Sequence, residues 1–398
     1  MKGGLGRYQF WCGFFRLDPD NETLAAPPRF TRSDTAMNRP WSGFLTVLLA
    51  AVLAVTSIGC QQQTEQEELV IYSGRSKALV DSLVEMYRQR TERPVSVKYG
   101  TDSQLLAALK EEGDQSPADV FWANTTGALS NAIENDLLTT LPDSLMNRPA
   151  RFAPASKQWV PVTTRFRVLA YNSSNVDSTD LPASVTGLPE IDELDGRIGW
   201  TPAYSSFQDF VTAVRTVEGE DAARQWLQGM QDLNPKSYTS NTPMIRALAA
   251  GEIDVALTNH YYVLRLKHGG AEGEYEEEEG EEEEAEEEEE APRRGAPVNT
   301  YHFASGDVGN LALVTGAGVL QTSDQREAAQ EFLQFLLSPD AQAFAASSVN
   351  EYPVVPDAGV QNYMLPVDDA LALSPDFNYD QLQEIDATLA LLRDEGLL

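Results

Sequence analysis

Two adjacent tyrosines, Tyr261 and Tyr262, are the residues whose type and spacing suggest the most specific chemistry in this chain. They follow residues 254–258, which have the pattern of a short strand. Neighbouring side chains of a strand point to opposite faces, so both tyrosines can face one site only where the strand has ended. A phenolate is a hard oxygen donor, and its proton must be displaced by the metal because free tyrosine has a pKa of about 10. The pair therefore predicts a site for Fe(III); the alternative is a packing pair with hydroxyls at the surface.

A second group of candidates could bind an anion. Arg165 and Arg167 precede a predicted strand, and a guanidinium can fork onto a carboxylate or a carbonate. We expect Arg165 to face the site and Arg167 to be a surface salt-bridge partner. Ser205 and Ser206 lie just before the helical pattern that begins at Phe207. Backbone N–H groups at a helix start form an anion site, although these serines could simply cap the helix.

His260 and His302 are potential metal ligands, but we expect neither to bind a metal. His260 alternates with Tyr261, so it points away from a site that both tyrosines share. The sequence contains no Walker-type or dinucleotide-binding glycine loop, and no convincing Ser/His/Asp arrangement. We therefore expect a binding protein without catalytic activity.

The elements that must position these residues alternate between strand and helix patterns. This alternation is typical of an α/β fold with a parallel sheet and helices on both faces. Ligands of such sheets bind beyond the carboxyl ends of the strands. Polar loops at these ends supply the remaining candidates for the site, Ser73, Arg75, Ser76, Asn124 and Asn259.

The charge balance argues against nucleic acid as a partner. The chain has 61 Asp and Glu against 29 Lys and Arg, and its net charge is −32, whereas phosphate binding needs clustered cations. Many of the acidic residues lie in a Glu-rich insert at 272–297, which repels itself and is expected to be a disordered surface loop. Weak calcium collection by this loop is an alternative function, although spaced Asp-x-Asp ligands are missing.

The first sixty residues contain a secretion signal. Residues 37–60 combine a positive start, an apolar run too short to span a membrane, and small residues before Cys60. A cysteine in this place looks like a bacterial lipoprotein processing site, so we expect lipid on Cys60 and a tether over 61–67. Residues 1–36 show no pattern, and we interpret them as a mis-assigned start. The expected location is the periplasmic or extracellular face of the cell membrane.

Six short motifs occur in a fixed order at residues 69–75, 117–122, 199–202, 259–262, 306–310 and 351–353. Together they resemble the bacterial ferric-ion-binding proteins of iron ABC transporters. The resemblance covers roughly residues 68–358, and the tyrosine pair in its context is the specific motif.

This resemblance implies a two-lobed, transferrin-like fold of the type II periplasmic binding proteins, with a ligand cleft between discontinuous lobes. We expect lobe one at 68–165 plus 299–363, and lobe two at 166–298 plus 364–398. It also implies an ABC permease as the partner, and we expect a monomer. A protein of the same fold that binds a polyamine, thiamine or an oxyanion is the alternative.

The resemblance assigns roles residue by residue. The tyrosine pair of the family matches Tyr261 and Tyr262, its anion-binding segment matches Ser205 and Ser206, and Arg165 stands at its arginine position.

The chain departs from the family at two ligand positions. The family often has a histidine where this chain has Ser76, and a glutamate where it has Asn124. Some branches lack these ligands and use more tyrosine plus carbonate. The resemblance therefore implies Fe(III) with carbonate or another synergistic anion, and Tyr204 is a candidate third tyrosine.

Overall fold

The computed structural model describes residues 66–146, 152–270, 295–355, 358–377 and 385–398. The predicted start segment, the signal with Cys60 and most of the predicted acidic insert lie outside these ranges. Within them, no helix is both long and apolar enough to cross a membrane.

Three parallel strands, each followed by a helix, form the first part of the sheet. The strands are β1 (Leu69–Ser73), β2 (Val95–Tyr99) and β3 (Val120–Ala123), in the spatial order β2-β1-β3. The helices that follow them are α2 (Lys77–Thr91), α3 (Asp102–Glu112) and α4 (Thr126–Glu134). Thr101 and Gln104 form a complete capping box at the start of α3. Three helix N-termini therefore lie along one edge of this part of the sheet.

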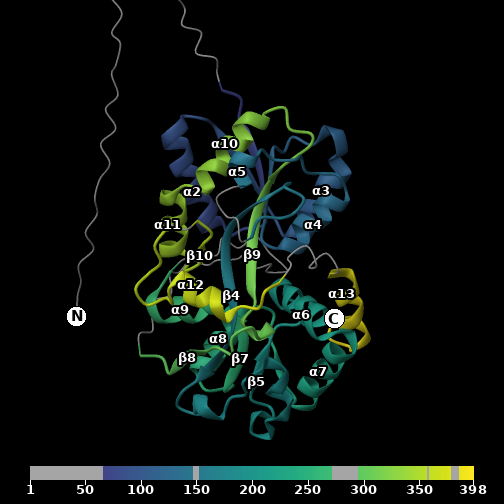
Figure 1. The fold of residues 1–398 in the computed structure, drawn as a ribbon, viewed down its shortest axis with the longest axis vertical. Helices are drawn as coiled ribbons and strands as arrows, with labels where there is room; N and C mark the ends of the chain where they lie inside the picture. The colour runs from purple at the N-terminus through teal and green to yellow at the C-terminus, as the bar shows by residue number, and fades with distance from the viewer. Residues whose placement is uncertain (1–65, 147–151, 271–294, 356–357, 378–384) are drawn as a thin grey trace, which may run out of the picture. The chain divides into compact units, whose positions relative to one another are not determined.

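Two long strands connect the first part of the sheet to the second. β4 (Val160–Asn172) pairs first with β9 (Ala312–Val319) and then with β7 (Val255–Asn259) and β8 (Val298–Tyr301). All these pairings are antiparallel, so the sheet is mixed, whereas the alternation of strands and helices led us to expect a parallel sheet. The physical reason is the path of the chain: β4 carries it out to the second part, and β9 brings it back (Figure 1).

The second part of the sheet returns to parallel strands with intervening helices. Its strands β5 (Ile198–Trp200) and β6 (Lys236–Ser237) run parallel, and β5 is also parallel to β7. Its helices are α6 (Ser205–Glu218), α7 (Glu220–Asp232), α8 (Asn241–Ala249) and α9 (His260–His268). Near the end of α9, Lys267 Nζ donates to Val298 O at 3.0 Å and to Asn299 Oδ1 at 2.8 Å. This contact joins the end of α9 to the start of β8.

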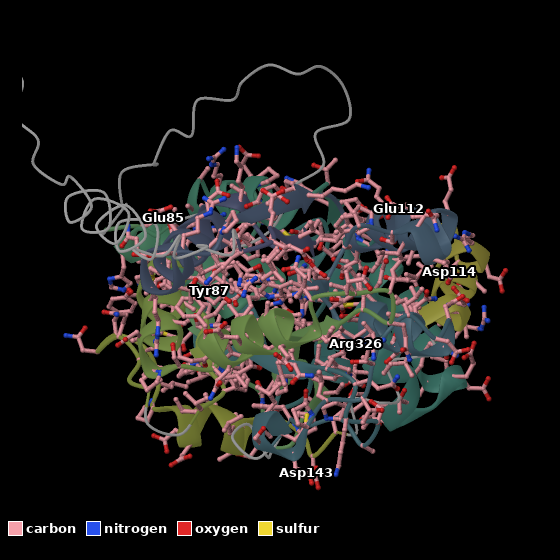
Figure 2. The ribbon with its side chains drawn as sticks, turned by 90° about the horizontal axis from the view of Figure 1, so that it is seen from above. Glu85, Tyr87, Glu112, Asp114, Asp143 and Arg326 are labelled. Atoms are coloured by element: carbon pink, nitrogen blue, oxygen red, sulfur yellow. The ribbon has the colours of Figure 1, made fainter. Side chains whose placement is uncertain are left out.

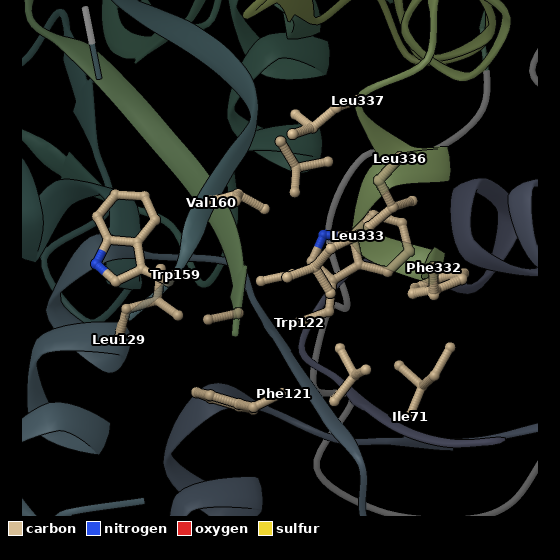
Figure 3. Close-up of a cluster of buried hydrophobic side chains, with 14 of the residues drawn as sticks. Ile71, Phe121, Trp122, Leu129, Trp159, Val160, Phe332, Leu333, Leu336 and Leu337 are labelled. Carbon is tan, nitrogen blue, oxygen red and sulfur yellow. The ribbon is translucent and has the colours of Figure 1, made fainter. Parts of the chain in front are cut away.

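The remaining elements cover the sheet. They are α5 (Asp143–Met146), α10 (Arg326–Leu336), α11 (Pro339–Ser348), β10 (Tyr352–Pro353), α12 (Val367–Leu373) and α13 (Ile385–Asp394). In the first core, Trp122 packs among apolar side chains that include Phe332 and Leu333 of α10 (Figure 3).

Two main cores result, and each is discontinuous along the chain. The first takes its residues from 69–166 and 312–371, and the second from 169–257, 303–313 and 377–392. The boundaries differ from those expected. Residues 299–311 belong with the second core because β8 pairs with the far half of β4, and residues 364–371 pack into the first.

Candidate functional site

The tyrosine pair lies in the first turn of α9, immediately after β7 ends at Asn259. Tyr261 and Tyr262 are 1% and 2% exposed, and their ring centres are 4.4 Å apart. A third tyrosine meets them, because the hydroxyl of Tyr204 lies 3.2 Å from that of Tyr262. We call Tyr204, Tyr261 and Tyr262 the tyrosine group.

Asn259 connects the tyrosine group to the predicted anion-binding residues. Its Nδ2 lies 3.4 Å from both Tyr261 Oη and Ser206 Oγ, and its Oδ1 accepts from Arg167 at 3.1 Å. Asn259 is fully buried and precedes α9 without capping it through its side chain. Its side-chain amide therefore contacts residues of the site and does not cap α9.

The two arginines of β4 are both buried, and they lie two residues apart on one face of the strand. The expectation that Arg167 is a surface residue is wrong. Arg167 is 1% exposed, donates to Asn259 and lies 5.2 Å from the ring centre of Phe210 in α6, which covers this face. Arg165 instead donates to Asn124 Oδ1 at 3.0 Å and to Asn124 O at 3.1 Å. Arg167 is thus bonded to the residue that contacts the tyrosine group.

Arg75, Arg165, Asn124 and Glu351 form a second buried group, which we call the arginine cluster. Asn124 Oδ1 accepts hydrogen bonds from both arginines. Glu351 pairs with Arg75 at 2.7 Å and lies 3.9 Å from Arg165. Two guanidinium groups thus lie at the carboxylate of Glu351, and the charge of Arg165 also acts on the nearby carboxyl of Asp102. By contrast, carboxylates such as Glu85, Asp114 and Asp143 project from the surface (Figure 2).

Loops at the carboxyl ends of β1 and β3 support the arginine cluster. Ser73 Oγ accepts from the backbone N–H of Arg75 at 3.2 Å. The hydroxyl of Ser76, which precedes α2, is buried and has no partner among the described residues. Asp102, at the start of α3, accepts from the backbone N–H of Asn124 at 2.9 Å, and burial raises the pKa of its carboxyl. The predicted site did not include Asp102, because its role depends on a loop 22 residues away along the chain.

Ser205 and Ser206 are the first two residues of α6 and do not precede it. Ser205 is exposed, whereas Ser206 is fully buried and contacts Asn259. Tyr204 is the N-cap residue, and its backbone O accepts from the N–H groups of Phe207 and Gln208. The positive end of a fourteen-residue helix thus adjoins the tyrosine group.

Residues 69–348 match the family model of the bacterial extracellular solute-binding proteins. The chain belongs to this family. It is a solute-binding protein and not an enzyme, and the resemblance and the fold class inferred from the motifs are confirmed.

Individual members of the family are similar over most of their length. The major ferric iron-binding protein of Neisseria meningitidis serogroup B is 28% identical over 83% of this chain and 93% of that protein. The Fe(3+)-binding periplasmic protein of Serratia marcescens is 27% identical over 88% and 97%. The crystal structure of iron-bound HitA from Pseudomonas aeruginosa is 29% identical, covers 83% of this chain and 99% of that one, and has a TM-score of 0.72.

The histidines of this solute-binding protein lie apart from the tyrosine hydroxyls. His260 Nδ1 accepts from Phe166 N at 3.1 Å, so its Nε2 carries the proton and donates to Asn350 O at 2.8 Å. Burial lowers the pKa of His260 to about 3 and keeps the ring neutral. His302 lines a small pocket beside Phe166, and burial lowers its pKa as well. No group of three His, Cys, Asp or Glu in the described ranges could hold a metal.

Proposed function

We propose that this solute-binding protein captures Fe(III) through the hydroxyl oxygens of Tyr261 and Tyr262, with Tyr204 as the third donor. The observation that carries the proposal is the meeting of these three phenol groups at one place. Fe(III) is a hard, highly charged cation that can displace phenolic protons. The names of the Neisseria and Serratia relatives, and the iron bound in the Pseudomonas structure, support the same cargo.

Iron binding exchanges phenolic protons for the metal. The hydroxyls of Tyr204 and Tyr262 are within hydrogen-bond distance of each other. Once both are deprotonated, two negative oxygens at this separation repel each other unless a cation lies between them. Asn259, which Arg167 holds in place, directs its amide toward Tyr261 and stabilises the charged form of that phenol. The site therefore favours a cation that enters as the protons leave.

We further propose that carbonate or another small anion supplies the missing oxygen ligands, since three phenolates do not fill the coordination shell of iron. The N-terminus of α6 at Ser205 and Ser206 offers N–H donors for it. The guanidinium groups of Arg75 and Arg165 offer charged donors for it.

Replacing Tyr261 or Tyr262 with phenylalanine tests the proposal. Each variant should lose the visible phenolate–iron band and weaken iron binding by more than the roughly 10–100-fold typical of a lost supporting residue. Tyr301→Phe is the matched control, because Tyr301 donates to Pro182 O at 3.0 Å elsewhere in the second core. Unchanged iron titrations of both site variants would refute the site. A wild-type protein that develops no colour with ferric citrate would favour a polyamine, thiamine or an oxyanion.

We also propose that the mature chain is anchored by lipid on Cys60 and delivers its cargo to an ABC permease as a monomer. The support is the signal-like segment 37–60 and the extracellular family. Intact mass spectrometry of the membrane fraction should find a chain that begins at a lipid-modified Cys60, and Cys60→Ala should release the protein from membranes. An unmodified Cys60, or a chain that keeps residues 1–36, would contradict the anchor.

A further inference from the structure

Asn350, outside the tyrosine helix, contacts both ends of that helix. Its backbone O accepts from His260 Nε2, on the first residue of α9, at 2.8 Å. Its Nδ2 donates to the backbone O of Gly269, the C-cap residue of α9, at 3.2 Å. Its Oδ1 accepts from the hydroxyl of Tyr363 at 2.6 Å. One buried residue thus fixes the position of the helix that carries Tyr261 and Tyr262.

The backbone of Asn350 is held in an uncommon conformation. Its φ is 58°, in the left-handed region that asparagine tolerates better than most residues. A left-handed residue shortly after a helix such as α11 often does no more than end that helix. Here the contacts of Asn350 reach a different helix, α9, so ending α11 does not account for them.

The next residue, Glu351, holds the arginine cluster. One carboxylate oxygen pairs with Arg75 and lies near Arg165, and the other accepts from Thr163 of β4. Tyr352 then begins β10, which pairs with β4. A single peptide bond therefore joins the residue that positions the tyrosine helix to the residue that positions both arginines.

We propose that Asn350 and Glu351 are positioning residues that couple the two halves of the site, so that occupancy at the arginine cluster changes the iron affinity of the tyrosine group. The inference rests on the proposed function. Neither residue needs to touch the cargo: Asn350 acts through α9, and Glu351 acts through Arg75 and Arg165. Because adjacent residues hold both groups, anion and iron should bind with positive coupling.

Asn350→Gly tests the coupling. Glycine accepts the left-handed backbone and keeps the carbonyl that His260 contacts, while the side-chain contacts to Gly269 and Tyr363 disappear. Iron affinity should fall about five- to tenfold, and the phenolate–iron band should shift. Asn234→Gly is the matched control, because Asn234 also has a positive φ, of 47°, and bonds to Asp195 away from the tyrosines.

The deciding quantity is the ratio of iron affinities measured with and without bicarbonate. We expect Asn350→Gly to shrink this ratio at least about threefold relative to wild type, and Asn234→Gly to leave it unchanged. A purely structural role would weaken both affinities equally, and an unchanged ratio in Asn350→Gly would overturn the inference. Equal iron affinities of the wild-type protein with and without bicarbonate would overturn the inference as well.

Two further points keep the result interpretable. If Asn350→Gly does not fold, Asn350→Asp replaces it, since that variant keeps the acceptor for Tyr363 and loses the donor to Gly269. A wild-type protein that fails to bind iron refutes the proposed function itself, whereas iron binding with an unchanged ratio refutes only the coupling.

Discussion

Arg165 and Arg167 are two residues apart on one face of β4, yet they contact different partners. Arg167 holds Asn259 beside the tyrosine group, and Arg165 holds Asn124 in the arginine cluster. An anion near this face of β4 would therefore be attracted by both guanidinium groups. Each arginine also holds a different asparagine in place. Replacing Arg165 and replacing Arg167 should consequently change the anion dependence of iron binding in different ways.

Replacing Arg165 with alanine should weaken iron binding in bicarbonate buffer by roughly tenfold, the size of a lost charged hydrogen bond. In anion-free buffer the same change should have much less effect, because the counter-charge for the anion is then not in use. Arg167→Ala should weaken binding in both buffers, because it also releases Asn259. Isothermal titrations in the two buffers measure both effects.

Arg197→Ala is the control, since Arg197 pairs with Asp254 at 2.6 Å away from both groups. Identical wild-type titrations in the two buffers, together with an Arg165→Ala variant that behaves like wild type, would count against the anion.

The sequence allowed some of these residues to be predicted and not others. Tyr261 and Tyr262 stand out because their chemistry depends on type and adjacency alone. Glu351 does not, because its partner Arg75 lies 276 residues away along the chain. Arg167 was misjudged for the same reason: the asparagine that it contacts is 92 residues away.

At the scale of elements, the start of α3 links local sequence to the site. The capping box at Thr101 makes the helix begin there, and this was predictable from the residue types alone. Asp102 then reaches the loop after β3 and accepts from the N–H groups of Asn124 and Thr125 at 2.9 and 3.0 Å. The start of one helix thus positions the loop that carries Asn124, the acceptor for both arginines.

Two neighbouring alanine variants should separate helix stability from support of the site. Thr101→Ala removes a cap and should lower the free energy of unfolding by about 1 kcal/mol without changing iron affinity. Asp102→Ala removes the partner of two backbone N–H groups and should cost about 2–3 kcal/mol, and it should also weaken iron binding through Asn124. Urea unfolding and iron titration of each variant measure the two effects, and an Asp102→Ala variant with wild-type iron affinity would show that the loop does not need this support.

Other elements escaped prediction for physical reasons. Only the part of β4 that follows the two arginines was predicted, because a proline at 161 and the following threonines hide its first half. Pro161 lies at an irregularity of the pairing with β9, where a missing N–H is tolerated. The antiparallel direction of β9 depends on where the chain returns, which residue patterns near β9 do not encode.

At the scale of the whole molecule, the chain is strongly acidic, yet it buries three arginines on or near β4. The net charge of −32 attracts cations over long distances, so it favours approach of a metal or a polyamine alike. Long-range attraction therefore does not distinguish one cation from another. Selection has to come from the interior, where β4 contributes Arg165 to the arginine cluster and Arg167 to the asparagine beside the tyrosine group.

The contact of Lys267 with the start of β8 has a consequence for the sequence insertions that this protein can tolerate. Lys267 of α9 contacts the first two residues of β8 directly, although the two elements are separated by about 30 residues along the chain. The cost of closing a flexible loop grows slowly, by about 0.6 kcal/mol for each doubling of its length. Natural insertions between α9 and β8, or a reporter domain inserted there, should therefore have little effect on the residues that hold the cargo.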